Sequence, residues 1–206
     1  MLERYQPVGV ILETAQNQHL NYTGIEISAV KRLSQRWMLN ASFTYQSSIW
    51  SFGDKGYLDP TNIDKWDGQP RDYDSRWLAK LSFLYQLPWG FNIGGFVNAR
   101  EGTVFQKQLR VSTPERAAIG IGSTTLIDVE KYGTSRLPDF YNFDISLVKD
   151  FLLGKYGKLS IQVDAFNLFN YNHILDRYSQ INSPRFKEVQ QILNPRVIRF
   201  GIRYRF

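Results

Sequence analysis

Apolar and polar residues alternate along seven segments of the chain. The segments are residues 21–32, 37–46, 76–86, 91–100, 141–150, 158–166 and 198–206. Successive side chains of a β-strand point to opposite faces of the sheet, so each segment has one apolar and one polar face. Each segment is about as long as the 9–11 residues that a tilted membrane-crossing strand needs. Because no long segment has helical periodicity, the pattern predicts an all-β protein.

The C-terminal segment shows the alternation most clearly. Its apolar positions are Ile198, Phe200, Ile202, Tyr204 and Phe206. The positions between them are Arg199, Gly201, Arg203 and Arg205. A soluble sheet would bury the apolar face in a core, whereas a membrane barrel would turn it to lipid and point the arginines into an aqueous lumen.

The connections between the predicted strands alternate in length. Residues 33–36, 87–90 and 152–157 are short, and residues 51–75, 103–138 and 171–194 are long. Bacterial outer-membrane barrels have short periplasmic turns and longer extracellular loops, and a compact soluble domain rarely has several loops beyond about 12–15 residues. The alternation predicts an antiparallel transmembrane β-barrel in the cell outer membrane. The long connections and residues 1–19 are expected outside the cell.

Composition agrees with a barrel. Aromatic residues make up 15% of the 206 residues, yet the mean hydropathy is −0.35. A barrel combines these values because half of each spanning strand faces water. Cysteine is absent, which excludes disulfides and Cys-ligated metals. The net charge of +6 is not gathered into a run or a helical face, so we expect outer-membrane lipid, not nucleic acid, as a partner.

The strand number leaves the domain organisation open. Bacterial single-chain barrels have an even number of strands, and seven predicted strands leave one without a partner. We therefore expect residues 1–206 to be the C-terminal part of a larger barrel. In one alternative, residues 8–16 form an eighth strand, and the chain is a small self-contained barrel acting as an adhesin or structural protein. In another, the chain is a soluble β-domain that binds acidic ligands.

Three stretches resemble the barrel of TonB-dependent outer-membrane receptors of Gram-negative bacteria, most closely the Oar-like group. They are residues 22–34, residues 159–170, which close on Asn-Leu-Phe-Asn, and residues 194–206. The resemblance implies a barrel of about 22 strands with an N-terminal plug. It also implies TonB-coupled uptake of a bulky nutrient such as a siderophore, an oligosaccharide or a peptide-like compound. The plug and the segment that contacts TonB are expected outside these residues.

The predicted loop 51–75 is the candidate ligand-binding segment. It contains Asp54, Tyr57, Asp59, Asp64, Trp66, Asp67, Asp72 and Tyr73. Carboxylates can bind calcium and aromatic rings can stack on a flat ligand. The spacing matches no EF-hand, and aspartates are also common in loops simply because they are solvated.

Charged residues on the predicted polar face form a candidate lumen charge ladder. They are Glu26, Asp144, Asp164, Arg199, Arg203 and Arg205. Asp144 and Asp164 are expected to pair with the arginines, since they share a face on nearby strands. The alternative role of these arginines is attraction of an anionic substrate.

The C-terminal apolar pattern resembles the signal that the barrel-assembly machinery reads. Its residues are Phe200, Ile202, Tyr204 and Phe206. The plain alternative is that they only face lipid. Catalysis is not expected, because His19 and His173 lie in predicted loops with no motif that links them to a serine or a carboxylate. No cofactor or resident metal is expected.

Overall fold

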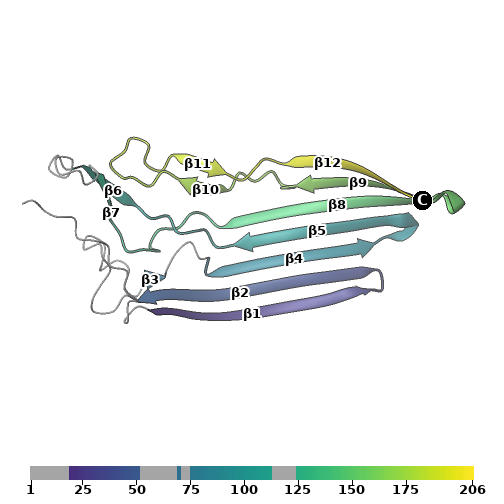
Figure 1. Ribbon diagram of the computed structural model, residues 1–206, viewed down its shortest axis with the longest axis horizontal. Coiled ribbons are helices and arrows are strands. Elements are labelled where there is room, and N and C mark those ends of the chain that lie inside the picture. The colour runs from purple at the N-terminus through teal and green to yellow at the C-terminus, as the bar shows by residue number, and fades with distance from the viewer. Residues whose placement is uncertain (1–18, 52–68, 71–74, 113–123) are drawn as a thin grey trace, which may run out of the picture.

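The computed structural model describes residues 19–51, 69–70, 75–112 and 124–206. Its main element is one antiparallel sheet in which strands that follow each other along the chain lie side by side (Figure 1). The order is β1 (His19–Ser34), β2 (Trp37–Ser51), β4 (Trp77–Gln86), β5 (Phe91–Arg100), β8 (Phe140–Leu152), β9 (Lys158–Phe166) and β12 (Val197–Arg205). The short strand β3 (Gln69–Pro70) pairs with the end of β2. All seven predicted strands, and the all-β antiparallel class, are confirmed.

The first two strands are longer than the alternation predicts. β1 has 16 residues and β2 has 15, and their pairing continues from Lys31 opposite Leu39 to His19 opposite Ser51. The alternation fades at Ser47 and Ser48, where two serines follow each other. Backbone hydrogen bonds do not require an apolar side chain, so the ladder extends past the end of the pattern.

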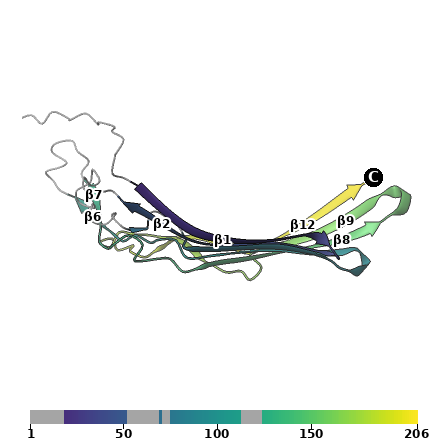
Figure 2. The same cartoon turned by 90° about the horizontal axis from the view of Figure 1, so that it is seen from below.

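The sheet is open. β1 and β12 are its two edges and do not pair with each other, so the described strands do not show a closed barrel, and the barrel stays a prediction. Figure 2 shows the sheet as a curved band. A barrel closes when its first and last strands pair. Here neither edge strand pairs with the other.

Two kinds of connection lie at opposite ends of the sheet, as predicted (Figure 1). At one end, which we call the short-turn end, the strands are joined by a two-residue turn and by the 3₁₀ turns η1 (Pro88–Gly90) and η2 (Gly154–Tyr156). Gln35 and Arg36 have φ values of 51° and 72°, as a type I′ hairpin turn requires. The C-terminus lies at the same end.

The long connections contain strands of their own, which corrects the expectation of plain loops. β6 (Gln108–Ser112) pairs with β7 (Thr124–Asp128), and β10 (Ile174–Arg177) pairs with β11 (Val189–Ile192). The hairpins satisfy backbone groups that these long segments would otherwise have to expose to water. The segments also contact each other, since Gln108 N–H donates to Ser179 O and Ile181 N–H donates to Gln108 O.

The apolar face of the sheet is exposed. On β12, Phe200 and Ile202 are 76% and 78% exposed, and Ile25 and Ile27 are exposed on β1. The buried apolar side chains among the described residues lie in the connection between β5 and β8; they are Val104, Phe105, Tyr132 and Leu137. An apolar surface of this extent marks contact with lipid or with another protein surface.

No helix in the described ranges has the length and apolar character needed to cross a membrane.

Candidate functional site

The polar face of the sheet brings charged side chains from β8, β9 and β12 into rows. Residues directly opposite each other on neighbouring strands share a face. One row contains Ser146, Asp164 and Arg199, another Asp150, Ser160 and Arg203, and a third Leu152, Lys158 and Arg205. A carboxylate on β9 therefore lies directly opposite an arginine of β12, and a carboxylate on β8 shares a row with another arginine two strands away.

Asp164 is at the centre of the first row. It is 5% exposed, and its carboxylate accepts hydrogen bonds from Ser146 Oγ at 2.6 Å and Gln162 Nε2 at 2.8 Å. Arg199 Nε and Nη2 donate to Asp164 Oδ2 at 2.9 and 2.8 Å, so the expected contact between these two residues is present. The Arg199 side chain is mostly exposed, so the pair stabilises the fold by at most about 1 kcal/mol.

Asp144 does not contact the arginines of β12, contrary to the expectation. Its Oδ1 accepts hydrogen bonds from Asn142 Nδ2 at 3.0 Å and from the backbone N–H of Asn167 at 2.8 Å. The strand order explains the difference, because Asp164 lies on β9, the strand next to β12, whereas Asp144 lies on β8. Asp144 instead holds the chain where β9 ends.

An ion pair between Asp150 and Lys158 was not among the expected contacts. Lys158 Nζ lies 2.7 Å from Asp150 Oδ2, and Ser160 Oγ donates to Asp150 Oδ1 at 2.6 Å. A signal was present, since Asp150 has the same strand parity as Asp144 and Lys158 starts the next strand. A hairpin brings these two positions together.

Arg203 and Arg205 line a hollow of about 290 Å³ on the polar face, together with Asp150 and Lys158. No ion pair in the described ranges includes either arginine. Glu26 lies on β1, at the opposite edge of the sheet from β12. The lumen ladder therefore divides into paired and unpaired members, and its role stays a prediction.

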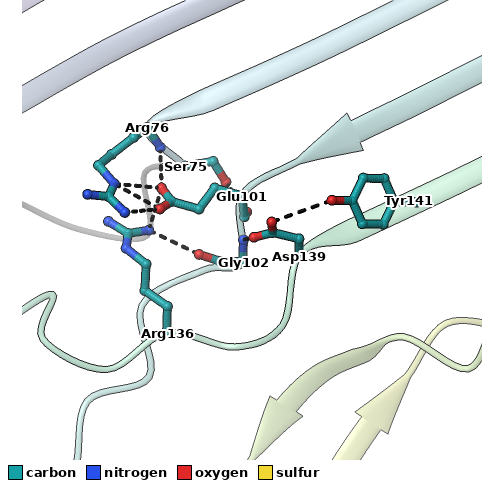
Figure 3. Close-up of polar contacts among 7 residues, drawn as sticks. All are labelled: Ser75, Arg76, Glu101, Gly102, Arg136, Asp139 and Tyr141. Carbon is teal, nitrogen blue, oxygen red and sulfur yellow. Dashed lines mark hydrogen bonds and ion pairs between the residues drawn. The ribbon is translucent and has the colours of Figure 1, made fainter.

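A second polar group, the rim cluster, lies where β4 begins and β5 ends (Figure 3). It consists of Ser75, Arg76, Glu101, Gly102, Arg136 and Asp139. Glu101 is 6% exposed and accepts hydrogen bonds from Arg76 Nε at 2.8 Å and from the Arg76 backbone N–H at 2.8 Å. Arg136 Nη1 lies 3.2 Å from Glu101 Oε2, the oxygen that also accepts the Arg76 backbone N–H. One buried carboxylate thus joins two arginines that are far apart in the sequence.

Burial would raise the pKa of Glu101. The hydrogen bonds from the Arg76 side chain and backbone, with the positive charges of Arg136 and Arg76, outweigh this effect and hold the pKa below its ordinary value. The same contacts raise the pKa of Arg76, chiefly through its hydrogen bond to Glu101. Glu101 is therefore an ionised structural anchor.

The rim cluster also fixes the backbone beside it. Gly102 N–H donates to Asp139 Oδ1 at 3.0 Å, and Arg136 Nη1 donates to Gly102 O at 3.0 Å. A Cβ atom at Gly102 would lie 1.7 Å from Leu137 O, so only glycine permits this approach. The long connection between β5 and β8 is held at both of its ends by this cluster.

The Asn-Leu-Phe-Asn stretch forms a turn after β9. Asn167 and Asn170 have φ values of 50° and 55°, a conformation that asparagine tolerates better than most residues. Asn167 Nδ2 donates to Tyr171 O and Asn194 O, and Asn170 Oδ1 accepts from the Arg196 N–H. These contacts hold the start of β12 against the end of β9, so the motif has a structural role.

The other candidate residues divide into three groups. The aspartates and aromatic residues of the predicted ligand loop, from Asp54 to Tyr73, lie outside the described residues. Phe200, Ile202 and Tyr204 occupy the exposed apolar face of β12, and Phe206 follows the strand and is fully exposed. His19 begins β1 instead of lying in a loop, and His173 Nε2 accepts the Tyr141 N–H at 3.3 Å. Within the described ranges, His, Cys, Asp and Glu form no group of three that could hold a metal ion.

Comparison with known proteins finds a likeness in fold but none in sequence. No protein-family model matches the chain, and no curated protein matches it in sequence. The fold is similar to that of FpvA of P. aeruginosa, a β-barrel receptor, in a complex with a heterologous pyoverdine and iron. The TM-score is 0.54 at 14% identity, and the match covers 90% of this chain and 19% of FpvA. The likeness shows a shared fold, and the chain spans about a fifth of FpvA.

Proposed function

We propose that this chain forms part of the barrel wall of an outer-membrane receptor that takes up a bulky nutrient with energy delivered through TonB. The observation that carries the proposal is the exposed apolar face of a curved sheet whose opposite face is polar. A barrel wall needs this combination, because one face contacts lipid and the other contacts an aqueous lumen. The fold likeness to FpvA and the sequence resemblance to the Oar-like group support the same reading.

The two edges of the sheet support a place within a larger barrel. β1 and β12 each present a row of backbone groups that no described strand pairs. Unpaired backbone groups are costly in lipid, so a membrane sheet must close through further strands. We propose that strands outside these residues pair with both edges.

The proposed orientation places the short-turn end in the periplasm and the long connections outside the cell. The loop 51–75 is then the first candidate for substrate capture, and the rim cluster holds the neighbouring connection in place. Arg203 and Arg205 lie on the lumen wall, where an acidic surface of the plug would contact them. The substrate class is a siderophore, an oligosaccharide or a peptide-like compound.

The test uses cells that produce the full-length protein. An epitope inserted after Asn182 is expected to bind antibody on intact cells, and an epitope inserted after Lys155 only after permeabilisation. The polypeptide is expected to be several times heavier than the 24.0 kDa of this chain. A heat-modifiable band near 24 kDa would contradict the receptor and favour the small self-contained barrel.

Transport is tested with labelled iron–siderophore, oligosaccharide and oligopeptide probes. Cells with and without the gene are compared in the presence and absence of an uncoupler. Gene-dependent uptake of one probe that the uncoupler abolishes would support energised transport. Equal uptake of all three probes with and without the gene would refute it.

A further inference from the structure

The short-turn end of the sheet is strongly cationic. Residues 29–40, 84–94, 147–160 and 201–206 contain Lys31, Arg32, Arg36, Lys149, Lys155, Lys158, Arg203 and Arg205. These four ranges contain one acidic side chain, that of Asp150, and it pairs with Lys158. The opposite end carries both signs of charge. Its acidic residues include Glu101, Asp128, Glu130, Asp139, Asp176 and Glu188. The charge of the sheet is therefore polarised along its strands.

Each of the three short turns places a lysine ammonium against an aromatic ring. The distances from Nζ to the ring centroid are 4.0 Å for Lys31 and Trp37, 4.4 Å for Lys149 and Phe91, and 5.2 Å for Lys155 and Tyr156. The same arrangement thus recurs at every turn along this end of the sheet.

Two of these lysines start on the apolar face and direct their charge towards the turn. Lys31 lies opposite Leu39, and Lys149 lies opposite Ile161. Lys31 Nζ donates to the carbonyl of Ser34 at 2.9 Å, and Lys149 Nζ donates to the carbonyl of Trp89. Their aliphatic stems run along apolar surface while the ammonium groups reach the strand ends. Lysines at the boundary of a membrane adopt this arrangement.

Exposed apolar side chains lie beside these cations. Trp89 and Leu152 are 84% and 82% exposed, and Tyr156 is exposed too. Aromatic residues with nearby lysines are typical of the membrane–water interface. A soluble acidic protein would need only the positive charge, whereas a lipid surface explains the charge and the apolar residues together.

We infer that the short-turn end is a binding surface for the headgroups of anionic phospholipids in the leaflet that it reaches. The inference rests on the proposed membrane insertion and adds the lipid class and the residues that select it. The positive charges of Lys31, Lys149 and Lys155 attract the phosphate groups, and the aromatic rings lie at the level of the headgroups. Clustered basic residues near a membrane attract anionic lipid.

The test measures lipid selectivity of the full-length protein in bilayers of phosphatidylcholine and phosphatidylglycerol. Electron spin resonance gives the association of spin-labelled phosphatidylglycerol relative to spin-labelled phosphatidylcholine. We expect the wild type to prefer phosphatidylglycerol. Each lysine-to-glutamine change is expected to lower the relative association of phosphatidylglycerol by about fivefold, so the variant K31Q/K149Q/K155Q should lose the preference.

Two control variants separate charge from folding. K31R/K149R/K155R keeps the charge and should keep the preference. R110Q/K131Q/K187Q removes the same charge from exposed residues of the long connections and should leave selectivity unchanged; Lys187 also lies near an aromatic ring, Phe186. If the glutamine variant does not fold, a salt titration of the wild type takes its place as the test. Added salt screens the lysine charges and must abolish the preference.

Three results would overturn the inference. They are equal association of the two lipids with the wild type, an unchanged preference in the glutamine variant, and a preference that salt does not weaken. In each case a protein that still inserts into the bilayer would leave the proposed function standing. A full-length protein that does not insert at all would refute the function itself, so the two failures are distinguishable.

Discussion

Replacing Glu101 with glutamine is expected to release the long connection between β5 and β8 without unfolding the sheet. Glutamine keeps the length of the side chain and removes the charge that two arginines share. Removing one partner of a buried ion pair costs about 3–5 kcal/mol. The Arg76 side chain is 57% exposed and regains water, which lowers the expected cost to about 2 kcal/mol.

Hydrogen exchange measures this cost locally. The amides of Gly102, Phe105 and Leu137 all donate hydrogen bonds across the connection. A loss of about 2 kcal/mol predicts about 30-fold faster exchange of these amides in E101Q. Amides in the middle of β4 and β5 should keep the wild-type rate, because their ladder does not involve Glu101.

The matched control is E188Q, which removes an exposed carboxylate paired with Arg185 on the same side of the sheet. It should leave exchange near Glu101 unchanged, since such a pair contributes little. Equal acceleration in the rim and in the middle of the sheet would refute the local role of Glu101. Unchanged exchange in E101Q would show that the ion pairs of the rim cluster do not hold the connection.

The same carboxylate predicts a dependence on pH. Because the folded-state pKa of Glu101 is lowered, its contribution is complete above its ordinary pKa of 4.5 and is lost as the pH falls through the folded-state value. The connection should therefore stay protected from proteolysis at neutral and mildly acidic pH and become cleavable in strong acid. Cleavage of E101Q should vary less over the same range; an equal response of both proteins would contradict the assignment.

Three further predictions concern single residues. R199Q should lower the free energy of unfolding in urea by less than about 1 kcal/mol, whereas D164A should cost about 2 kcal/mol because it leaves buried donors without an acceptor; equal losses would contradict this asymmetry. G102A should destabilise the protein by about 1–3 kcal/mol, since its Cβ meets Leu137 O, and a neutral result would show that the backbone can separate there. F206D should lower outer-membrane assembly more than folding in detergent, because Phe206 is fully exposed, and equal losses in the two assays would argue against recognition by the assembly machinery.

The strands were predictable because their signal is local. Each of the seven segments carries its own alternation, and the structure confirms every one, with their antiparallel order and the alternation of short and long connections. The contact of Asp164 with Arg199 followed from parity and from the adjacency of β9 and β12. The hairpins in the long connections were missed, because β6, β7, β10 and β11 are too short for periodicity to stand out.

The rim cluster could not be predicted. Arg76 lies in the connection before β4, whereas Glu101 and Arg136 lie at opposite ends of the connection between β5 and β8, and their spacing of 25 and 35 residues follows no motif. Antiparallel pairing brings the beginning of β4 beside the end of β5, and with them Arg76 and Glu101. The path of the connection between β5 and β8 then places Arg136 against the same carboxylate. Such a contact depends on the three-dimensional course of the chain, which local patterns do not record.

The sequence by itself determined which residues form strands and which face of each strand is apolar, because both follow from a period of two along the chain. The tertiary structure decided the register between strands, the partners of Asp144, Asp150 and Glu101, and the open state of the sheet. An open and a closed sheet have the same alternation within every strand. They differ only in whether the backbone groups of the two edges find partners, and that depends on how strands pair across the whole sheet.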